Sequence, residues 1–128
     1  MSDSAPQVTA VAAIDAQRAI VEALSVYRFR YSSEYDLQRG IVAALQHSGL
    51  EYEREAKIPS GRLDFLCSGI AVEVKTRGSL GDLTRQIHRY LQEPDVRGVL
   101  VVTTRSIHRD LPDEISGKPV RVYWASEL

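Results

Sequence analysis

The segment IAVEVK, residues 70–75, is the best starting point for understanding this chain. Its short apolar run predicts a β-strand, yet the strand carries an acid, Glu73, and a base, Lys75. Side chains at positions i and i+2 of a strand project to the same face. Glu73 and Lys75 are therefore expected on one face, with Val72 and Val74 on the other. An acid and a base in a strand of this kind require an explanation.

The strand predicted just before it, residues 62–67, carries a second acid, Asp64. Ser68-Gly69 between the two strands suits a tight hairpin, which would bring Asp64 close to Glu73. Two neighbouring carboxylates repel, so the pKa of one should rise unless a cation joins them. Hard oxygen ligands suit Mg²⁺ or Mn²⁺. The alternative is structural: a half-exposed polar strand face, with Glu73 and Lys75 as an ion pair.

Periodicity and turn residues predict the other elements. Helices are expected over residues 10–29, 33–48 and 78–93, strands over 50–58, 62–67, 70–76, 98–104 and 119–124, and a loop or short helix over 105–115. This order predicts an α/β fold with a single mixed sheet flanked by helices. The strands at 70–76 and 98–104 should be parallel, because a helix connects them.

The length of 128 residues predicts one domain. Residues 1–9 are small and polar and are expected to be flexible, and residues 10–128 to form the domain, with an accessory helix at 10–31 and a core at 33–124. The chain shows no secretory signal and no apolar stretch of membrane-spanning length. A single cysteine, Cys67, cannot form an internal disulfide and is typical of a cytoplasmic protein.

Basic residues are concentrated in the middle of the chain. Residues 54–109 hold ten basic and six acidic side chains, although the whole chain has a net charge of −1. Arginine outnumbers lysine, 13 to 3, which suits forked recognition of phosphate. An ordinary solvated surface would account for the same charges.

Three further polar residues lie beside predicted apolar helix faces. Glu34 falls within the stripe of the second helix, although an acid near a helix N-terminus is also favoured by the macrodipole. Gln86 and Tyr90 are one turn apart on the third helix, whose predicted buried stripe is Leu83, Ile87, Tyr90 and Leu91. For Gln86 and Tyr90, the simpler interpretation is that they are polar flanks of an amphipathic helix. The three histidines have no zinc-ligand spacing.

Taken in order, these residues resemble the PD-(D/E)XK nuclease superfamily. The resemblance covers about residues 33–104 and uses Glu34, Asp64, the Glu73-Val74-Lys75 triplet, Gln86 and Tyr90. The spacing of Gln86 and Tyr90 is similar to that in the RecB-like branch, and the strand triplet looks like that of Holliday junction resolvases and compact phage nucleases. The residue before Asp64 is leucine, where many members have proline.

The resemblance implies a restriction-endonuclease-like core, αβββαβ, with an extra N-terminal helix. It implies a Mg²⁺- or Mn²⁺-dependent DNA endonuclease or exonuclease, of the kind found in DNA repair or recombination. Asp64, Glu73, the Val74 carbonyl and Glu34 would bind the metal, and Lys75 would position the attacking water. Gln86 and Tyr90 would hold the lysine or the scissile strand. Arg77, Arg85 and Arg89 are the candidate contacts to the DNA backbone.

Two alternatives remain open at this point. The first is a catalytically inactive nucleic-acid-binding or assembly module on the same fold, which the small size and near-neutral charge would suit. The second is a junction-resolving homodimer, in which the N-terminal helix could supply the dimer face, or a chain whose specificity comes from a partner protein. No membrane partner is expected.

Overall fold

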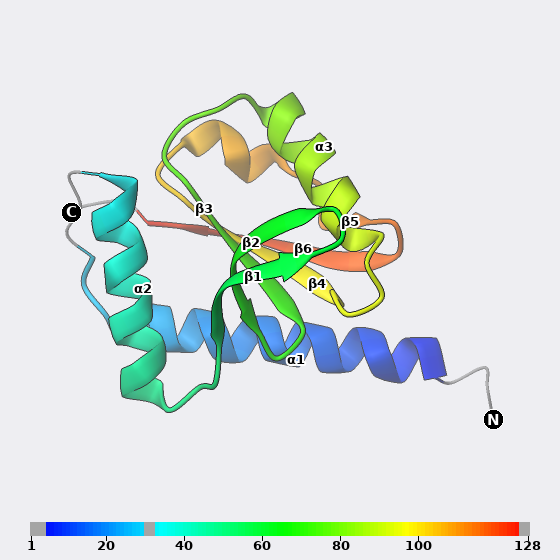
Figure 1. The fold of residues 1–128 in the computed structure, drawn as a ribbon, viewed down its shortest axis with the longest axis horizontal. Helices are drawn as coiled ribbons and strands as arrows, with labels where there is room; N and C mark the ends of the chain where they lie inside the picture. Colours follow the sequence, from blue (N-terminus) through cyan, green and yellow to red (C-terminus); the bar gives the residue numbers. More distant parts are fainter. Residues whose placement is uncertain (1–4, 30–32, 126–128) are drawn as a thin grey trace.

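The computed structural model describes residues 5–29 and 33–125, and of residues 5–9 the backbone alone. One six-stranded mixed sheet lies between helices on its two faces (Figure 1). The elements are α1 (Ala5–Ser25), α2 (Glu34–Ser48), β1 (Glu53–Ile58), β2 (Gly61–Cys67), β3 (Ile70–Lys75), α3 (Leu80–Leu91), β4 (Gly98–Thr103), η2 (Ser106–Asp110), β5 (Glu114–Ile115) and β6 (Lys118–Trp124).

The strand order is β1-β2-β3-β4-β6-β5. β1, β2 and β3 are antiparallel neighbours, whereas β3, β4 and β6 are parallel to one another. The predicted α/β class and the predicted parallel pairing of β3 with β4 are both confirmed. In the part of the chain that the structure describes, no helix is long and apolar enough to cross a bilayer.

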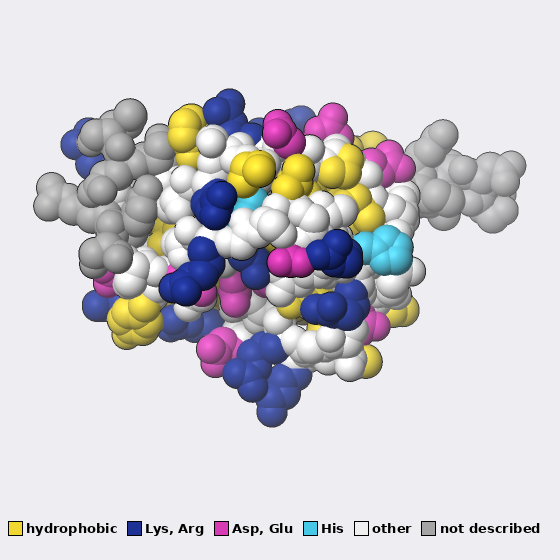
Figure 2. All heavy atoms as spheres, turned by 90° about the horizontal axis from the view of Figure 1, so that it is seen from above, with side chains coloured by type: hydrophobic (Ala, Val, Ile, Leu, Met, Phe, Trp, Pro, Cys, Tyr) yellow, Lys and Arg dark blue, Asp and Glu magenta, His cyan; other side chains and the backbone are white. Residues whose placement is uncertain are grey.

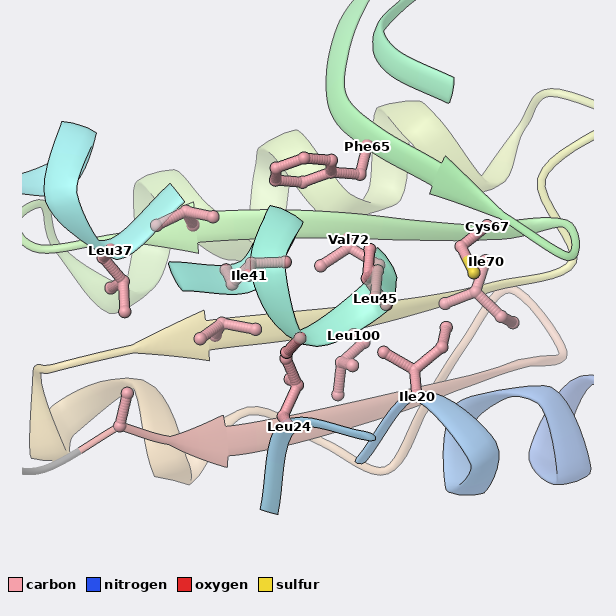
Figure 3. Close-up of a cluster of buried hydrophobic side chains, with 14 of the residues drawn as sticks. Ile20, Leu24, Leu37, Ile41, Leu45, Phe65, Cys67, Ile70, Val72 and Leu100 are labelled. Atoms are coloured by element: carbon pink, nitrogen blue, oxygen red, sulfur yellow. The ribbon is translucent and has the colours of Figure 1, made fainter. Parts of the chain in front are cut away.

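Helices α1 and α2 cover one face of the sheet and build the first core cluster (Figure 3). The apolar stripe of α2, Leu37, Ile41, Ala44 and Leu45, is buried. The Asp36 N–H donates to Ser33 Oγ at 3.1 Å and caps the start of the helix, and Gly49 ends it at φ +77°. Side chains from both helices meet β3 and β4 in this cluster, including Ile20, Leu24, Ile41, Val72 and Leu100.

Helix α3 covers the opposite face and builds a second cluster with β3, β4 and β6. All four residues of its predicted stripe are buried. Ser79 caps its N-terminus by accepting the Asp82 N–H at 3.1 Å. At its other end, the Lys118 ammonium donates to the carbonyls of Leu91, Glu93 and Val96.

Helix α1 differs from its predicted bounds of 10–29. It begins at Ala5 and ends at Ser25, so residues 5–9, expected to be flexible, are helical, while residues 1–4 lie outside the described part. The chain leaves the helix early because the ring of Phe29 packs between Tyr27 and Tyr123, at centroid distances of 5.4 and 6.4 Å. Strand β5 lies within the segment predicted as a loop or short helix.

The β1–β2 hairpin changes faces halfway along its length. Phe65 packs in the cluster under α1 and α2, but Leu63, two residues earlier, packs in the α3 cluster. Glu55 lies opposite this point and has a left-handed φ of +53°, which lets β1 turn with its partner. The hairpin tip thus bends toward α3 (Figure 1), where Ser60 N–H donates to Glu93 Oε2 at 3.0 Å.

Candidate functional site

Asp64 and Glu73 lie where β2 separates from β3. The ladder between these strands is regular as far as the pair Phe65 and Val72. Beyond it, the Asp64 N–H donates to Glu73 Oε2 and the Val74 N–H donates to Asp64 Oδ2, both at 2.8 Å. Each carboxylate thus replaces a backbone acceptor that the bend of β2 removes. The expectation that the hairpin brings the two acids together is confirmed.

Both carboxyl groups are shifted toward their protonated forms. Glu73 is only 2% exposed. Burial, reinforced by the charge of Asp64, raises its pKa from 4.5 to about 8. Burial also raises the pKa of Asp64, although the hydrogen bond from Val74 and the charge of Lys75 oppose the shift. The pair therefore carries less than its full negative charge near neutral pH, and a nearby cation would favour full ionisation.

Gln86 and Tyr90 form a hydrogen-bonded pair beside these acids. Gln86 Nε2 donates to the Tyr90 hydroxyl at 2.9 Å, and the hydroxyl donates to the Arg62 carbonyl of β2 at 3.2 Å. The hydroxyl is also close enough to Glu73 to oppose the rise of that residue's pKa. The pair thus links α3 to both strands that carry the acids.

A cleft of about 430 Å³ opens beside Lys75, along the first turns of α3. Its cationic lining consists of Lys75, Arg77, Arg85 and Arg89, and Gln86 also borders it. Figure 2 looks onto this side of the molecule and shows Lys and Arg side chains across it, with acidic side chains between them. The N-terminal end of α3 adds partial positive charge. The cleft is suited to bind an anion with several oxygens.

Two of the cleft's arginines have partners already. Arg85 pairs with the exposed Asp82 one turn earlier on α3. The Arg89 guanidinium lies 5.6 Å from the centroid of the Tyr90 ring. Exposed ion pairs such as that of Arg85 contribute little to stability, and Arg89 remains exposed beside the ring, so both cations are able to contact a ligand. The three arginines expected from sequence to contact phosphate all border one cleft.

His108 fixes one wall of this cleft, through Gly78. This role was not identified from the sequence. The ring is fully buried, with Nδ1 2.7 Å from Thr103 Oγ1 and Nε2 3.0 Å from the Gly78 carbonyl. The Gly78 carbonyl can only accept, so Nε2–H donates to it; in that tautomer Nδ1 accepts the proton of the Thr103 hydroxyl, whose oxygen accepts the Arg105 N–H. The network fixes the loop between β3 and α3. No local pattern links residue 108 to residue 78, so no sequence signal could have found it.

Glu34 does not join Asp64 and Glu73 in a metal-binding group. Its side chain is exposed in the first turn of α2, although its charge contributes to the raised pKa of Asp64. Among residues 5–29 and 33–125, no three His, Cys, Asp or Glu side chains form a metal-binding group. The expected meeting of three acids is therefore limited to Asp64 and Glu73.

Asp64, Glu73 and Val74 nevertheless suit Mg²⁺ as a donor set. A strand residue directs its N–H and C=O toward the same neighbour, so the Val74 carbonyl faces the opening between β2 and β3, as its N–H does. Each carboxylate uses one oxygen for a backbone amide and has a second. Mg²⁺ is usually held by one or two carboxylates and keeps several waters, so a third acid is not required.

Comparison with known proteins adds no further information. No family model, no curated protein and no solved structure matches this chain. The functional argument consequently depends on the geometry of the site and on the residues that form it.

Proposed function

We propose that this protein is a metal-dependent DNA nuclease of the PD-(D/E)XK type. The observation that carries the proposal is the pair of half-buried Asp64 and buried Glu73 next to Lys75, which lines a cleft together with three arginines. The acids suit a divalent cation, and the cations suit the phosphates of a nucleic acid backbone. The element order α2-β1-β2-β3-α3-β4 agrees with the core implied by the sequence resemblance.

The site residues would have two separate roles, metal binding and orientation of the attacking water. Asp64, Glu73 and the Val74 carbonyl would hold Mg²⁺ or Mn²⁺, and Glu34 could reach it through water. A bound Mg²⁺ lowers the pKa of a coordinated water and shields phosphate charge. Lys75, on the same face as Glu73, would orient the attacking water and stabilise charge on the phosphate.

The cleft would position the substrate. Arg77, Arg85 and Arg89 would contact phosphates, which fix the position of the strand without reading its sequence. Gln86 and Tyr90 would keep α3 at a fixed distance from the acids, because their hydrogen bonds join the helix to β2. Lys75 borders both the acid pair and the cleft, so the reacting phosphate would lie beside its ammonium group.

The test is cleavage of plasmid and linear DNA in Mg²⁺ by the wild type and by Lys75→Ala and Asp64→Asn. Asparagine keeps an oxygen that can accept the Val74 N–H, so the fold should survive while the charge is lost. We expect cleavage to fall by about a hundredfold or more in both variants. Asp15→Asn and Arg18→Ala on α1, which covers the opposite face, are matched controls and should cut normally.

Undiminished cleavage by folded Lys75→Ala and Asp64→Asn would reject this mechanism. Circular dichroism and urea unfolding of each variant establish that the fold is retained. Equal loss in the α1 controls would also reject it, because the loss would then not depend on the site.

A non-catalytic nucleic-acid-binding module is the second candidate, and one observation favours it. Both acids already serve a structural purpose, since each accepts a backbone N–H that the bent strand exposes. Binding of DNA that weakens with salt, without cleavage in Mg²⁺ or Mn²⁺, would support this candidate over the nuclease. Each phosphate contact should contribute about one to the slope of log affinity against log salt.

A further inference from the structure

Trp124 lies at the same edge of the sheet as the proposed site, but none of the chemistry above uses it. In the parallel register Lys75 is beside Thr103, and Thr103 is beside Trp124. Two inter-strand spacings, about 10 Å, separate the backbones of Lys75 and Trp124. Val120 and Val122 on β6 pack with the α3 cluster, so Trp124, two residues further, belongs to the same face.

The indole ring is held in a defined orientation while much of it stays in contact with water. Its side chain is 43% exposed. Nε1–H donates to the Thr104 carbonyl at 3.4 Å, and the Arg109 guanidinium lies 4.6 Å from the ring centroid. The hydrogen bond holds the edge of the ring and the guanidinium covers one of its faces, so a flat ligand would stack on the part of the ring that remains exposed. Aromatic rings stack favourably on one another in offset arrangements.

An open hollow of about 260 Å³ adjoins the ring. Leu111, Val120 and Val122 supply apolar lining and Arg109 supplies positive charge, while Arg121 and the acid Asp113 also border the hollow. Apolar surface beside guanidinium groups matches a ligand that combines a flat base with a phosphate. Nucleotides of single strands are bound in this way, by stacking on aromatic side chains and by contacts from arginine.

A line of arginines connects this hollow with the cleft. Arg77 follows β3 by two residues, Arg105 follows β4 by two residues, and Arg109 comes from η2. All three are exposed. They lie at the carboxyl ends of parallel strands, the edge where ligands of open α/β sheets usually bind. At the stacked rise of about 3.4 Å per nucleotide, the distance of about 10 Å corresponds to about three nucleotides.

We propose that Trp124 and Arg109 form a subsite that stacks an unpaired nucleobase. The substrate class would then be DNA with a single-stranded segment that runs from this subsite past Arg105 into the cleft. A paired base is covered on both faces by its neighbours in the duplex, so only an unpaired base can stack on the indole. The use of the bound strand for cleavage rests on the proposed nuclease function, whereas the binding itself does not.

Trp124 is the only tryptophan of the chain, so its fluorescence reports on this subsite alone. A short oligodeoxythymidylate, titrated into the protein in EDTA so that no cleavage occurs, should quench the emission saturably. A blunt duplex of the same length should quench it far less. Absence of quenching by the single strand, or equal quenching by the duplex, would overturn the proposal.

Variants separate stacking from folding. With a labelled oligodeoxythymidylate followed by anisotropy, Trp124→Leu should bind about tenfold more weakly, and Trp124→Phe should recover most of the affinity. Tyr35→Leu is a matched control, because Tyr35 is also exposed and lies 5.8 Å from an arginine, Arg39, but on α2. An equal loss in the Tyr35 variant, or none in Trp124→Leu, would overturn the proposal.

Failure of this proposal is distinguishable from failure of the nuclease. Lys75→Ala should lose cleavage but keep the quenching of Trp124. A wild-type protein that shows quenching without cleavage in Mg²⁺ would retain the subsite and reject the nuclease. A protein that cuts DNA without single-strand quenching would retain the nuclease and reject the subsite.

Discussion

The two faces of the central sheet differ in the side chains that the same strands present to the helices covering them. Under α1 and α2, side chains such as Phe65, Val72 and Leu100 meet a closely packed apolar cluster. Under α3 the cluster begins in the same way, with Ala71 and Val101. Toward the carboxyl ends of the strands, however, the apolar side chains give way to polar ones: Glu73, Lys75 and Thr103.

This difference separates stability from chemistry within one sheet. The α1/α2 face carries buried apolar area, whose removal from water stabilises the fold. The α3 face gives up part of that area for groups that are costly to bury, which is the usual mark of a functional site. A sheet covered on both sides can tolerate this because the opposite face supplies a complete core.

The largest expected effect on stability lies on the α1/α2 face. Ile41 is fully buried, so Ile41→Ala should lower the free energy of unfolding by about 2–5 kcal/mol. Urea unfolding measures the loss, and DNA cleavage by the folded variant should stay within a few-fold of the wild type. Arg39→Ala, an exposed position on the same helix, should change stability little. A large loss of cleavage in folded Ile41→Ala would break the division between the two faces.

The next effect concerns pH and lies on the α3 face. The pKa of Glu73 is about 8 in the folded protein and about 4.5 when it is unfolded. Between these values the folded state binds more protons, so the free energy of unfolding should fall as pH rises from about 4.5 to 8. The stabilisation that protonated Glu73 contributes is on the order of a few kcal/mol, and it should be fully lost above pH 8.

Glu73→Gln should remove this dependence, because glutamine does not titrate and keeps an oxygen for the Asp64 N–H. Urea unfolding of both proteins at a series of pH values from about 4.5 to above 8 measures it, with the exposed Glu114→Gln as control. A stability that rises through this range in the wild type would contradict the assigned direction of the pKa shift.

Magnesium should stabilise the α3 face by a smaller amount. At a concentration one hundred times its dissociation constant, a ligand that binds only the folded state adds about 2.7 kcal/mol. The melting temperature should rise with Mg²⁺ in the wild type and much less in Asp64→Asn. Ca²⁺-free buffers and matched ionic strength with NaCl control for general salt effects. Melting curves that do not respond to millimolar Mg²⁺ would count against a cation at the acid pair.

The smallest expected effects come from the two helix caps, which can be compared directly. Ser33 caps α2 and Ser79 caps α3, each by accepting a backbone N–H at 3.1 Å. Replacement of either by alanine should cost about 1 kcal/mol of stability. Only Ser79 lines the cleft, so only Ser79→Ala should also weaken DNA binding. Equal affinity of the two variants for DNA would indicate that DNA does not bind in this cleft.

Features that depend on neighbours in sequence were predictable. The buried stripes of α2 and α3 and the hairpin at Ser68-Gly69 follow from helical period and turn preference. The pairing of Asp64 with Glu73 was also predictable, since a tight hairpin leaves few registers. These rules act over a few residues, so no knowledge of the tertiary structure was needed to apply them.

Features that depend on contacts between distant segments were not predictable from the sequence. The bend at Glu55, the link from His108 to Gly78 and the exposure of Glu34 all result from how the hairpin and helices pack on the sheet. The early end of α1 has the same origin, because Phe29 packs against Tyr123 across the fold.

From the order of residues alone, one learns that this chain forms a mixed α/β sheet and that two acids and a lysine share a strand pair. The tertiary structure adds that β2 separates from β3 one residue past the pair Phe65 and Val72, so that the two carboxylates accept backbone amides instead. It also brings Arg85 and Arg89 of α3 to one cleft. The reason is that periodicity acts within an element, whereas the convergence of side chains depends on the twist and contact of several elements at once.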